Sequence, residues 1–170
     1  VVRYGNVVGS RGSVVPLFMR LRHEGRITIT HPEMTRFWIT LEEGVQFVLD
    51  SVIRMQGGEI FVPKIPSSTI LDVAEAIAPG IPVEHIGIRP GEKLHEMMIS
   101  ADDARHTWEM DDHYVITPEF PWWPSDSQST RGGKRALDGF VYSSEHNDRW
   151  LTVEEIRALV QPFDPQAGEG

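Results

Sequence analysis

Hydrophobic residues recur at helical intervals in the segment that follows Thr40. Apolar side chains stand at positions 45, 48, 49, 52 and 53, which is the spacing of one helix face. Thr40 and Glu43 have the spacing of a capping box, in which each side chain binds the backbone N–H group of the other residue. The pattern predicts a helix from Leu41 to about Met55.

Shorter patterns predict the remaining elements. Ser13 is placed to cap a helix, Thr152 and Glu155 form a second capping box, and further helices are predicted over 70–78 and from about Glu92. Short runs that alternate or are rich in β-branched residues predict strands at 1–4, 26–30, 59–62 and 83–88. Because strands and helices alternate, the predicted fold class is α/β.

The chain opens on Val1-Val2-Arg3-Tyr4, without a methionine. β-Branched and aromatic residues suit a pleated, buried strand, so the opening residues are predicted to be a strand already in progress. We therefore expect that the N-terminus has been cut away and that the chain presents an incomplete sheet edge.

The composition is that of a globular domain, since 40% of the 170 residues are hydrophobic and 24% are charged. A net charge of −9 without a basic stripe argues against nucleic-acid binding, because phosphates would repel the surface. The chain has no cysteine, which excludes disulfides and makes a cytoplasmic location the expected one. No apolar run is long enough for a bilayer, so no membrane partner is expected.

The first candidate site is the glycine-rich loop at 5–12, between the opening strand and a helix. Ligands of α/β sheets bind at such strand ends. Asn6 offers a donor and an acceptor, and Arg11 brings a positive charge near the helix N-terminus. The spacing is not Gly-x-Gly-x-x-Gly, so the loop is not predicted to be the main dinucleotide cradle. A tight turn with a surface arginine explains these residues equally well.

Two further loops carry arginines that could bind a diphosphate. Arg36 lies between a strand and a helix, where its guanidinium could form two hydrogen bonds to phosphate. A turn at Pro90 and Gly91 holds Arg89 near Glu92, which suits an anion beside a sugar hydroxyl. Each has a structural alternative: Arg36 as a surface residue beside core aromatics, which is favoured when it is taken alone, and Glu92 as a partner of the helix dipole.

Catalytic residues are not predicted in this chain. No histidine pair has metal-ligand spacing, so no metal site is expected. The tyrosines at 4, 114 and 142 are followed four residues later by Val8, Pro118 and His146. None therefore forms the Tyr-x-x-x-Lys pair of short-chain dehydrogenases, and the chain alone is expected to be inactive.

Four separated stretches resemble the extended short-chain dehydrogenase/reductase superfamily, in particular its polysaccharide-biosynthesis branch of inverting UDP-N-acetylglucosamine 4,6-dehydratases. The stretches are Val2–Ser13, Met34–Thr40, Gly58–Lys64 and Ile88–Glu96, with a weaker match at 142–151. The resemblance implies a Rossmann-type fold of which this chain is the C-terminal, substrate-binding part. The missing N-terminal part would bind most of the NADP cofactor and carry the catalytic residues.

The resemblance also implies an organisation of the chain. Residues 1–12 would be the end of the Rossmann sheet and the active-site loop, 13–117 the sugar-nucleotide-binding α/β region, 118–140 a long loop or arm, and 141–170 a C-terminal helix and tail. Val7 would face the nicotinamide of NADP. The residues expected to contact the UDP-sugar substrate are Asn6, Arg11, Gly12, Ser13, Val14, Thr28, Arg36, Arg89 and Glu92.

The implied activity of the full-length protein, a homo-oligomer, is that of a lyase. NADP would take a hydride from C4 of the sugar, water would leave across C5 and C6, and the hydride would return to C6 with inversion at C5. The UDP-4-keto-6-deoxy-sugar would serve surface-glycan or flagellin glycosylation, as in the pseudaminic-acid route. The alternatives are a UDP-sugar 4-epimerase or a retaining 4,6-dehydratase of the same superfamily, and a non-catalytic binding or assembly module.

Overall fold

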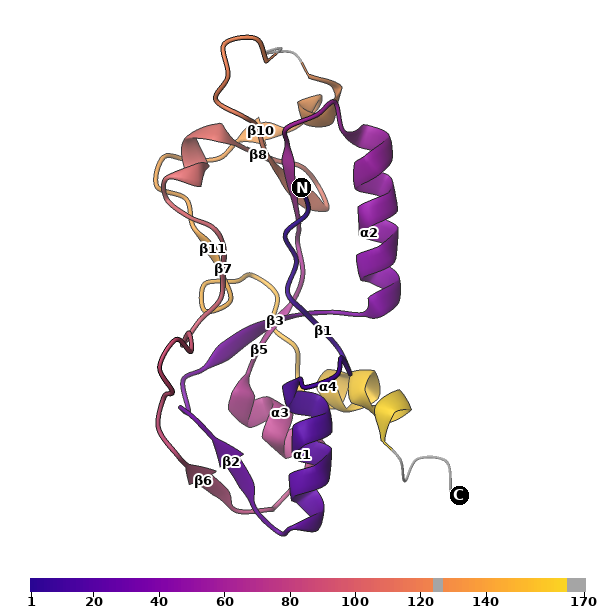
Figure 1. Cartoon of the computed structure of the whole chain (residues 1–170), viewed down its shortest axis with the longest axis vertical. Coiled ribbons are helices and arrows are strands. Elements are labelled where there is room, and N and C mark those ends of the chain that lie inside the picture. The colour runs from indigo at the N-terminus through magenta and orange to yellow at the C-terminus, as the bar shows by residue number, and fades with distance from the viewer. Residues whose placement is uncertain (124–126, 165–170) are drawn as a thin grey trace.

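The computed structural model describes residues 1–123 and 127–164. The α-helices of this part of the chain are α1 (Val14–His23), α2 (Leu41–Arg54), α3 (Ile70–Ile77) and α4 (Val153–Val160). Its 3-10 turns are η1 (Asp103–His106), η2 (Gln128–Thr130) and η3 (Gln161–Phe163). Figure 1 shows an elongated molecule in which α1, α3 and α4 gather at one end, while α2 runs along the other end.

Short strands form four small sheets in the described residues. They are β1 (Asn6–Val7), β2 (Ile27–Ile29), β3 (Thr35–Ile39), β4 (Ile60–Pro63), β5 (Ser67–Thr69), β6 (Val83–His85), β7 (Met97–Ile99), β8 (Thr107–Glu109), β9 (His113–Ile116), β10 (Lys134–Arg135) and β11 (Tyr142–Ser143). The sheet orders are β1-β3-β5, β10-β8-β9-β4, β11-β7 and β2-β6. Mixed helices and strands confirm the predicted α/β class.

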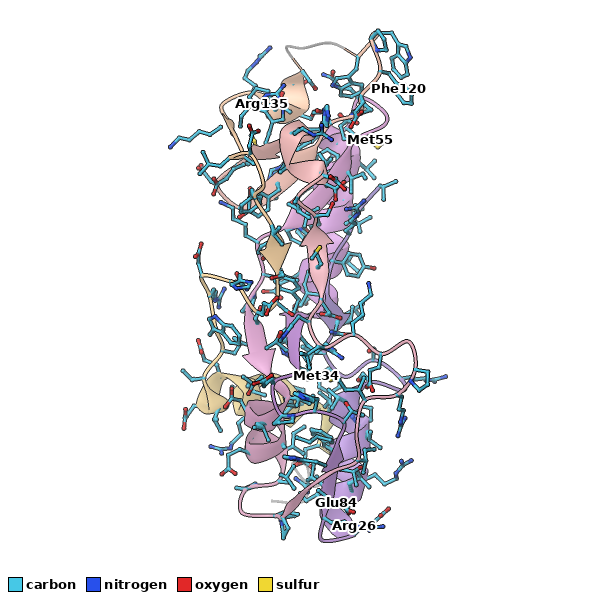
Figure 2. The ribbon with its side chains drawn as sticks, turned by 90° about the vertical axis from the view of Figure 1, so that its left-hand side faces the viewer. Arg26, Met34, Met55, Glu84, Phe120 and Arg135 are labelled. Atoms are coloured by element: carbon cyan, nitrogen blue, oxygen red, sulfur yellow. The ribbon has the colours of Figure 1, made fainter. Side chains whose placement is uncertain are left out.

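The described strands pair in both directions, and β3 has a parallel neighbour on one side and an antiparallel neighbour on the other. β1 pairs with β3 and β2 with β6 in parallel, and the other named pairs are antiparallel. Figure 2 shows Arg26 and Glu84 together at the tip of the helical end, beside the β2–β6 pair, where their charged atoms are 3.6 Å apart. This exposed ion pair adds little to the stability of the fold.

Capping boxes fix the starts of α2 and α4, as the sequence predicts. At α2 the Thr40 hydroxyl accepts a hydrogen bond from the Glu43 backbone at 3.2 Å, and the Glu43 carboxylate accepts one from the Thr40 backbone at 2.9 Å. Thr152 and Glu155 make the same two contacts at α4. Each box satisfies two of the N–H groups that a helix start leaves without partners.

Strand β3 separates two hydrophobic cores. Trp38 faces the helical end, where residues of α1, α3 and α4 form the larger core. Phe37 and Ile39, its neighbours along the strand, face the second core around Tyr114 and Tyr142. This alternation is the period-two pattern of a strand that is buried on both faces. β3 therefore links the two ends of the molecule.

The predicted helix near Glu92 is wrong. Residues 89–96 form an irregular loop that ends where β7 begins. Gly91 has a φ of +82°, a left-handed conformation that a helix interior does not accept. The Glu92 carboxylate accepts a hydrogen bond from the Arg89 backbone at 3.2 Å, which closes a turn instead of supporting a helix start.

The strand predicted at 1–4 is wrong in its position, because the first strand, β1, lies at Asn6–Val7 and only an isolated bridge precedes it. Val2 forms a parallel bridge with Phe61 of β4, and the Arg3 backbone N–H donates to the Phe61 carbonyl at 3.0 Å. The predicted strand at 83–88 is shorter, since β6 ends at His85. In the predicted arm at 118–140, β10 pairs with β8, so part of the arm is ordered on a sheet. Residues 124–126 of the arm and 165–170 of the predicted tail lie outside the described residues.

Helix α2 carries an apolar face that the described chain does not cover. Leu49, Val52 and Ile53 are exposed on this face. The buried residues of α2 are the small Gly44 and Ser51, on the opposite side. The helix therefore forms as predicted, but residues 1–123 and 127–164 leave Leu49, Val52 and Ile53 of its hydrophobic stripe exposed.

Candidate functional site

A cavity of about 300 Å³ lies between the start of α1, strand β2 and the loop that follows β6. Eight of the nine predicted substrate residues line it: Asn6, Gly12, Ser13, Val14, Thr28, Arg36, Arg89 and Glu92. Arg11 is exposed and lies outside the lining. Segments that are far apart in the sequence thus meet at one cavity at the helical end of the molecule.

The start of α1 offers this cavity hydrogen-bond donors and a positive dipole. Ser13 is the N-cap residue in extended conformation, but its side chain makes no capping bond. Its hydroxyl is buried and has no hydrogen-bond partner within the described chain. Gly12 has a φ of +75°, which lets the loop turn into the helix. Free N–H groups at a helix N-terminus bind anions, so this end of α1 suits a phosphate.

The loop around Arg89 is tied to β2 through Glu92. One carboxylate oxygen of Glu92 accepts from the Arg89 backbone N–H at 3.2 Å, and the other accepts from the Thr30 hydroxyl at 3.3 Å. The Arg89 guanidinium makes no hydrogen bond or ion pair to any described residue, and the residue is exposed beside the cavity. It is therefore free to bind an anionic ligand through two parallel hydrogen bonds.

Arg36 lines the same cavity but is engaged with the protein. Its guanidinium donates to the carbonyls of Thr35 at 2.6 Å, of Leu94 at 3.0 Å and of Lys93 at 3.0 Å. Burial lowers the pKa of Arg36 from its ordinary value, and the carboxylates of Glu96 and Glu92 partly oppose this shift. The two arginines line one cavity, and Arg36 also holds the loop that carries Arg89.

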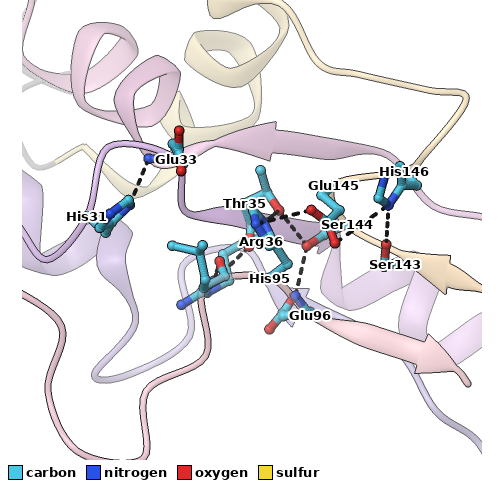
Figure 3. A network of polar contacts seen from close by, with 11 residues as sticks. His31, Glu33, Thr35, Arg36, His95, Glu96, Ser143, Ser144, Glu145 and His146 are labelled. Atoms are coloured by element: carbon cyan, nitrogen blue, oxygen red, sulfur yellow. Dashed lines mark hydrogen bonds and ion pairs between the residues drawn. The ribbon is translucent and has the colours of Figure 1, made fainter.

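A network of hydroxyl, imidazole and carboxylate groups connects the loop at 89–96 to β3 and to the segment after β11 (Figure 3). The Thr35 hydroxyl is 2.7 Å from the Ser144 hydroxyl and 2.9 Å from Nδ1 of His95. The Ser144 hydroxyl also accepts from the Glu96 backbone at 2.9 Å. His95 reaches Glu145 through Nε2 at 3.2 Å. The segment after β11 is therefore fixed to the loop that lines the cavity.

Sequence reasoning missed several residues of the site. Thr30 lines the cavity and binds Glu92, and its position two residues after Thr28 on a strand could have revealed it. Met34 also lines the cavity, and Figure 2 shows it at the level where the helical end meets the middle of the molecule. Ser144 had no such signal, because its contact with Thr35 joins positions 109 residues apart.

The remaining observations limit the chemistry of the site. Within the described part of the chain, no group of His, Asp and Glu residues could hold a metal ion. No helix among the described residues is long and apolar enough to cross a membrane. The cavity combines arginines, hydroxyls and a carboxylate, which suits a ligand that is both anionic and rich in hydroxyl groups.

Comparison with known proteins shows which family the chain belongs to. The family described as "Polysaccharide biosynthesis protein" matches residues 1–118. The chain belongs to this family. It is 50% identical over 167 residues to a protein of Campylobacter jejuni subsp. jejuni serotype O:2 named "UDP-N-acetylglucosamine 4,6-dehydratase (inverting)", a match that covers 94% of this chain and 50% of that protein.

A further relative and a solved structure are also similar to this chain over most of its length. A protein of Rickettsia canadensis named "UDP-glucose 4-epimerase" is 37% identical over 172 residues, covering 94% of this chain and 48% of that protein. A solved structure titled "X-ray structure of Pen from Bacillus thuringiensis" superposes with a TM-score of 0.78 at 32% identity, covering 95% of this chain and 49% of that one. The chain thus has the fold of one part of an extended short-chain dehydrogenase and spans about half the length of the relatives it matches.

Proposed function

We propose that this chain is the sugar-nucleotide-binding half of a UDP-N-acetylglucosamine 4,6-dehydratase of the C5-inverting type. The observation that carries the proposal is the meeting of Arg89, Glu92, Asn6 and the start of α1 at one cavity. The 50% identity to a protein named for that activity supports the choice of substrate class. The whole protein would be a lyase that serves polysaccharide biosynthesis.

In this proposal each wall of the cavity has a role. Arg89 and the free N–H groups at the start of α1, with the Ser13 hydroxyl, bind the diphosphate. Glu92 accepts hydrogen bonds from the ribose, and Thr28 lies near the uridine. Arg36 contributes positive charge while it holds the loop, because three of its hydrogen bonds go to backbone carbonyls. Arg11 would bind the ligand only from outside the cavity.

Among the described residues, those at β1 fit an NADP cofactor, and only at its nicotinamide side. Val7 lies on β1 beside Asn6, half-buried, and offers an apolar contact. The glycine-rich loop is not an open cradle, because a Cβ atom at Gly9 would overlap the ring of Phe163. When bound, NADP would supply reversible hydride acceptance. The contribution of this chain would be to hold the sugar in a fixed position against that side of the cofactor.

The net reaction that the binding must support is the loss of one water from the sugar. C4 is oxidised from an alcohol to a ketone, and C6 is reduced to a methyl group, so the redox changes balance. The proton lost at C5 is replaced on the opposite face, which inverts that centre. The product would be a UDP-4-keto-6-deoxy-sugar for surface glycans or flagellin, and we place the full-length homo-oligomer in the cytoplasm.

The test uses the full-length protein that contains this chain, with UDP-N-acetylglucosamine and NADP. NMR of the products is expected to show a 4-keto-6-deoxy sugar with inverted C5. A product with retained C5 would assign the retaining dehydratase, and conversion at C4 alone would assign the epimerase that the Rickettsia relative is named for. If no sugar is converted while UDP still binds, the non-catalytic module would be correct.

The same assay on this chain alone is expected to give no keto sugar above a control without protein. The reason is that no described cavity residue forms a tyrosine and lysine pair for proton transfer. Product formation by the isolated chain would contradict the assignment of catalysis to residues outside it.

A further inference from the structure

Asn6 lies where β1 reaches the cavity, and its side-chain amide faces two groups that can only accept hydrogen bonds. Nδ2 of Asn6 donates to the carboxylate oxygens of Glu96 at 3.0 and 3.1 Å and to the Phe37 carbonyl at 3.3 Å. Carboxylate and carbonyl oxygens cannot donate, so chemistry allows one orientation of the amide, with Nδ2 toward Glu96.

Glu96 is itself held in place through its main chain and its side chain. Its carboxylate accepts from the Phe37 backbone N–H at 2.9 Å. Its own N–H donates to the Ser144 hydroxyl at 2.9 Å, and its carbonyl accepts from the Ser144 N–H at 2.8 Å (Figure 3). β3 and the segment after β11 thus fix the carboxylate that orients Asn6.

The polar atom of Asn6 that remains is Oδ1. It makes no hydrogen bond to any residue within 1–123 and 127–164, and Asn6 lines the cavity. A carboxamide whose N–H groups are engaged can present only an acceptor to a ligand. A phosphate or carbonyl oxygen placed there would be repelled, whereas a hydroxyl or an amide N–H would be bound.

We propose that Glu96 is a positioning residue that turns the Asn6 amide so that its oxygen alone is offered to the ligand. Asn6 then selects a hydrogen-bond donor on the sugar of the bound nucleotide, either a hydroxyl or an amide N–H. This inference rests on the proposed function, because it places a sugar nucleotide in the cavity. Neither arginine can give this selectivity, since a guanidinium only donates.

The informative substitution is Glu96→Gln, which keeps the length of the side chain. A glutamine can still accept from Phe37, but its amide can also donate to Oδ1 of Asn6. Both orientations of the Asn6 amide then become possible, and the acceptor is no longer fixed toward the sugar. The matched control is Glu145→Gln, because Glu145 contacts His95 in the same network and has no contact with Asn6.

The experiment measures affinity for UDP and for UDP-N-acetylglucosamine by calorimetry in the full-length protein. Glu96→Gln and Asn6→Ala are each expected to weaken UDP-N-acetylglucosamine about five- to twentyfold, the scale of one lost polar contact, with UDP nearly unchanged. Because Glu96 acts through Asn6, the double variant should bind no more weakly than Asn6→Ala. Glu145→Gln should alter neither affinity.

Equal weakening of UDP and of UDP-N-acetylglucosamine by Glu96→Gln would overturn the proposal, since that pattern indicates a merely structural role. Full additivity of the two substitutions would also overturn it. If Glu96→Gln does not fold, Glu96→Asp must show the same selective loss. A wild-type protein that binds no UDP-sugar would refute the proposed function and this inference together, whereas normal turnover with an unaffected Glu96→Gln variant would refute the inference alone.

Discussion

Helices α3 and α2 have the same kind of amphipathic sequence but opposite surroundings. On α3 the apolar residues Ile70, Val73 and Ile77 are all buried against α1 and α4. On α2 the apolar Leu49 and Ile53 face outward, and Ile53 is 82% exposed. The comparison teaches that a hydrophobic stripe predicts a helix and its apolar face, but does not predict that the partner of this face belongs to the same chain.

The largest expected effect tests this contrast with one substitution made at both ends of the molecule. Ile77→Ala on α3 is expected to lower the free energy of unfolding by about 2–5 kcal/mol, because Ile77 is 4% exposed and its loss leaves a cavity. Ile53→Ala on α2 should change it by less than about 0.5 kcal/mol. Urea unfolding measures both values. Similar losses in the two variants would show that the α2 face is packed in solution.

The helical end also contains the cavity, so substitutions there should change ligand affinity, which substitutions on the exposed face of α2 should not. In the full-length protein Arg89→Lys and Arg36→Lys are each expected to weaken UDP-sugar binding by roughly 1.5–3 kcal/mol, since lysine lacks the planar fork of donors. The double variant should lose less than the sum, because both residues border one cavity.

Thermal melting separates the two arginines. Arg36→Lys should also lower the melting temperature, because Arg36 donates to the Lys93 and Leu94 carbonyls, whereas Arg89→Lys should not. NADP binding should stay nearly constant in both variants. An Arg89→Lys protein with unchanged UDP-sugar affinity would remove Arg89 from the proposed diphosphate site.

Local rules predicted most elements of the fold, and long-range contacts explain the failures. The capping boxes at Thr40 and Thr152 are local, so both helix starts were predictable from four residues each. Glu92 had the local features of a helix start, but its carboxylate binds the hydroxyl of Thr30, 62 residues away in the sequence, and the expected helix is absent. A pattern of neighbouring residues cannot reveal a partner that is so distant in the sequence.

The candidate site divides in the same way. Residues in the glycine-rich loop and around Arg89 carried visible chemistry, and the cavity brings them together. Glu96 stood in a matched stretch without an evident role, because its partner Asn6 lies 90 residues away. The exposure of the α2 face depends on what else contacts it, which no pattern within this chain encodes.

A smaller effect is expected in the second core, beside α2, from Tyr142. Its hydroxyl donates to the Ile65 carbonyl at 3.0 Å and accepts from the Ile65 backbone N–H at 2.9 Å. Burial raises the pKa of Tyr142 to about 12, although the bond from the Ile65 N–H opposes the shift. Tyr142→Phe should lower stability by roughly 1–2 kcal/mol at neutral pH, because it leaves the Ile65 groups unpaired.

The pH dependence of that effect has a defined sign. A tyrosine has an unfolded pKa of about 10, so a raised folded pKa gives stability that is complete below pH 10 and is lost as pH rises toward 12. Unfolding experiments from pH 8 to 12 should therefore show the difference between wild type and Tyr142→Phe shrinking above about pH 10. The control Tyr4→Phe alters an exposed ring and should match wild type. A difference that grows with pH would contradict the assignment.

The smallest change in folding stability, and the sharpest test of the comparison, is expected from a charge on the α2 face. Ile53→Lys should leave the free energy of unfolding within about 0.5 kcal/mol of wild type, because the site is exposed. It should nevertheless reduce the self-association of this chain at high concentration, because an uncovered apolar stripe is a site of association.

Light scattering after size exclusion measures this self-association. Leu137→Lys places the same charge on an apolar residue that is 83% exposed but lies outside α2, and it should change association less. If wild type stays monomeric at all concentrations, or if both lysines act equally, the apolar face is not what drives association, and the contrast between α2 and α3 would be one of solvent exposure alone.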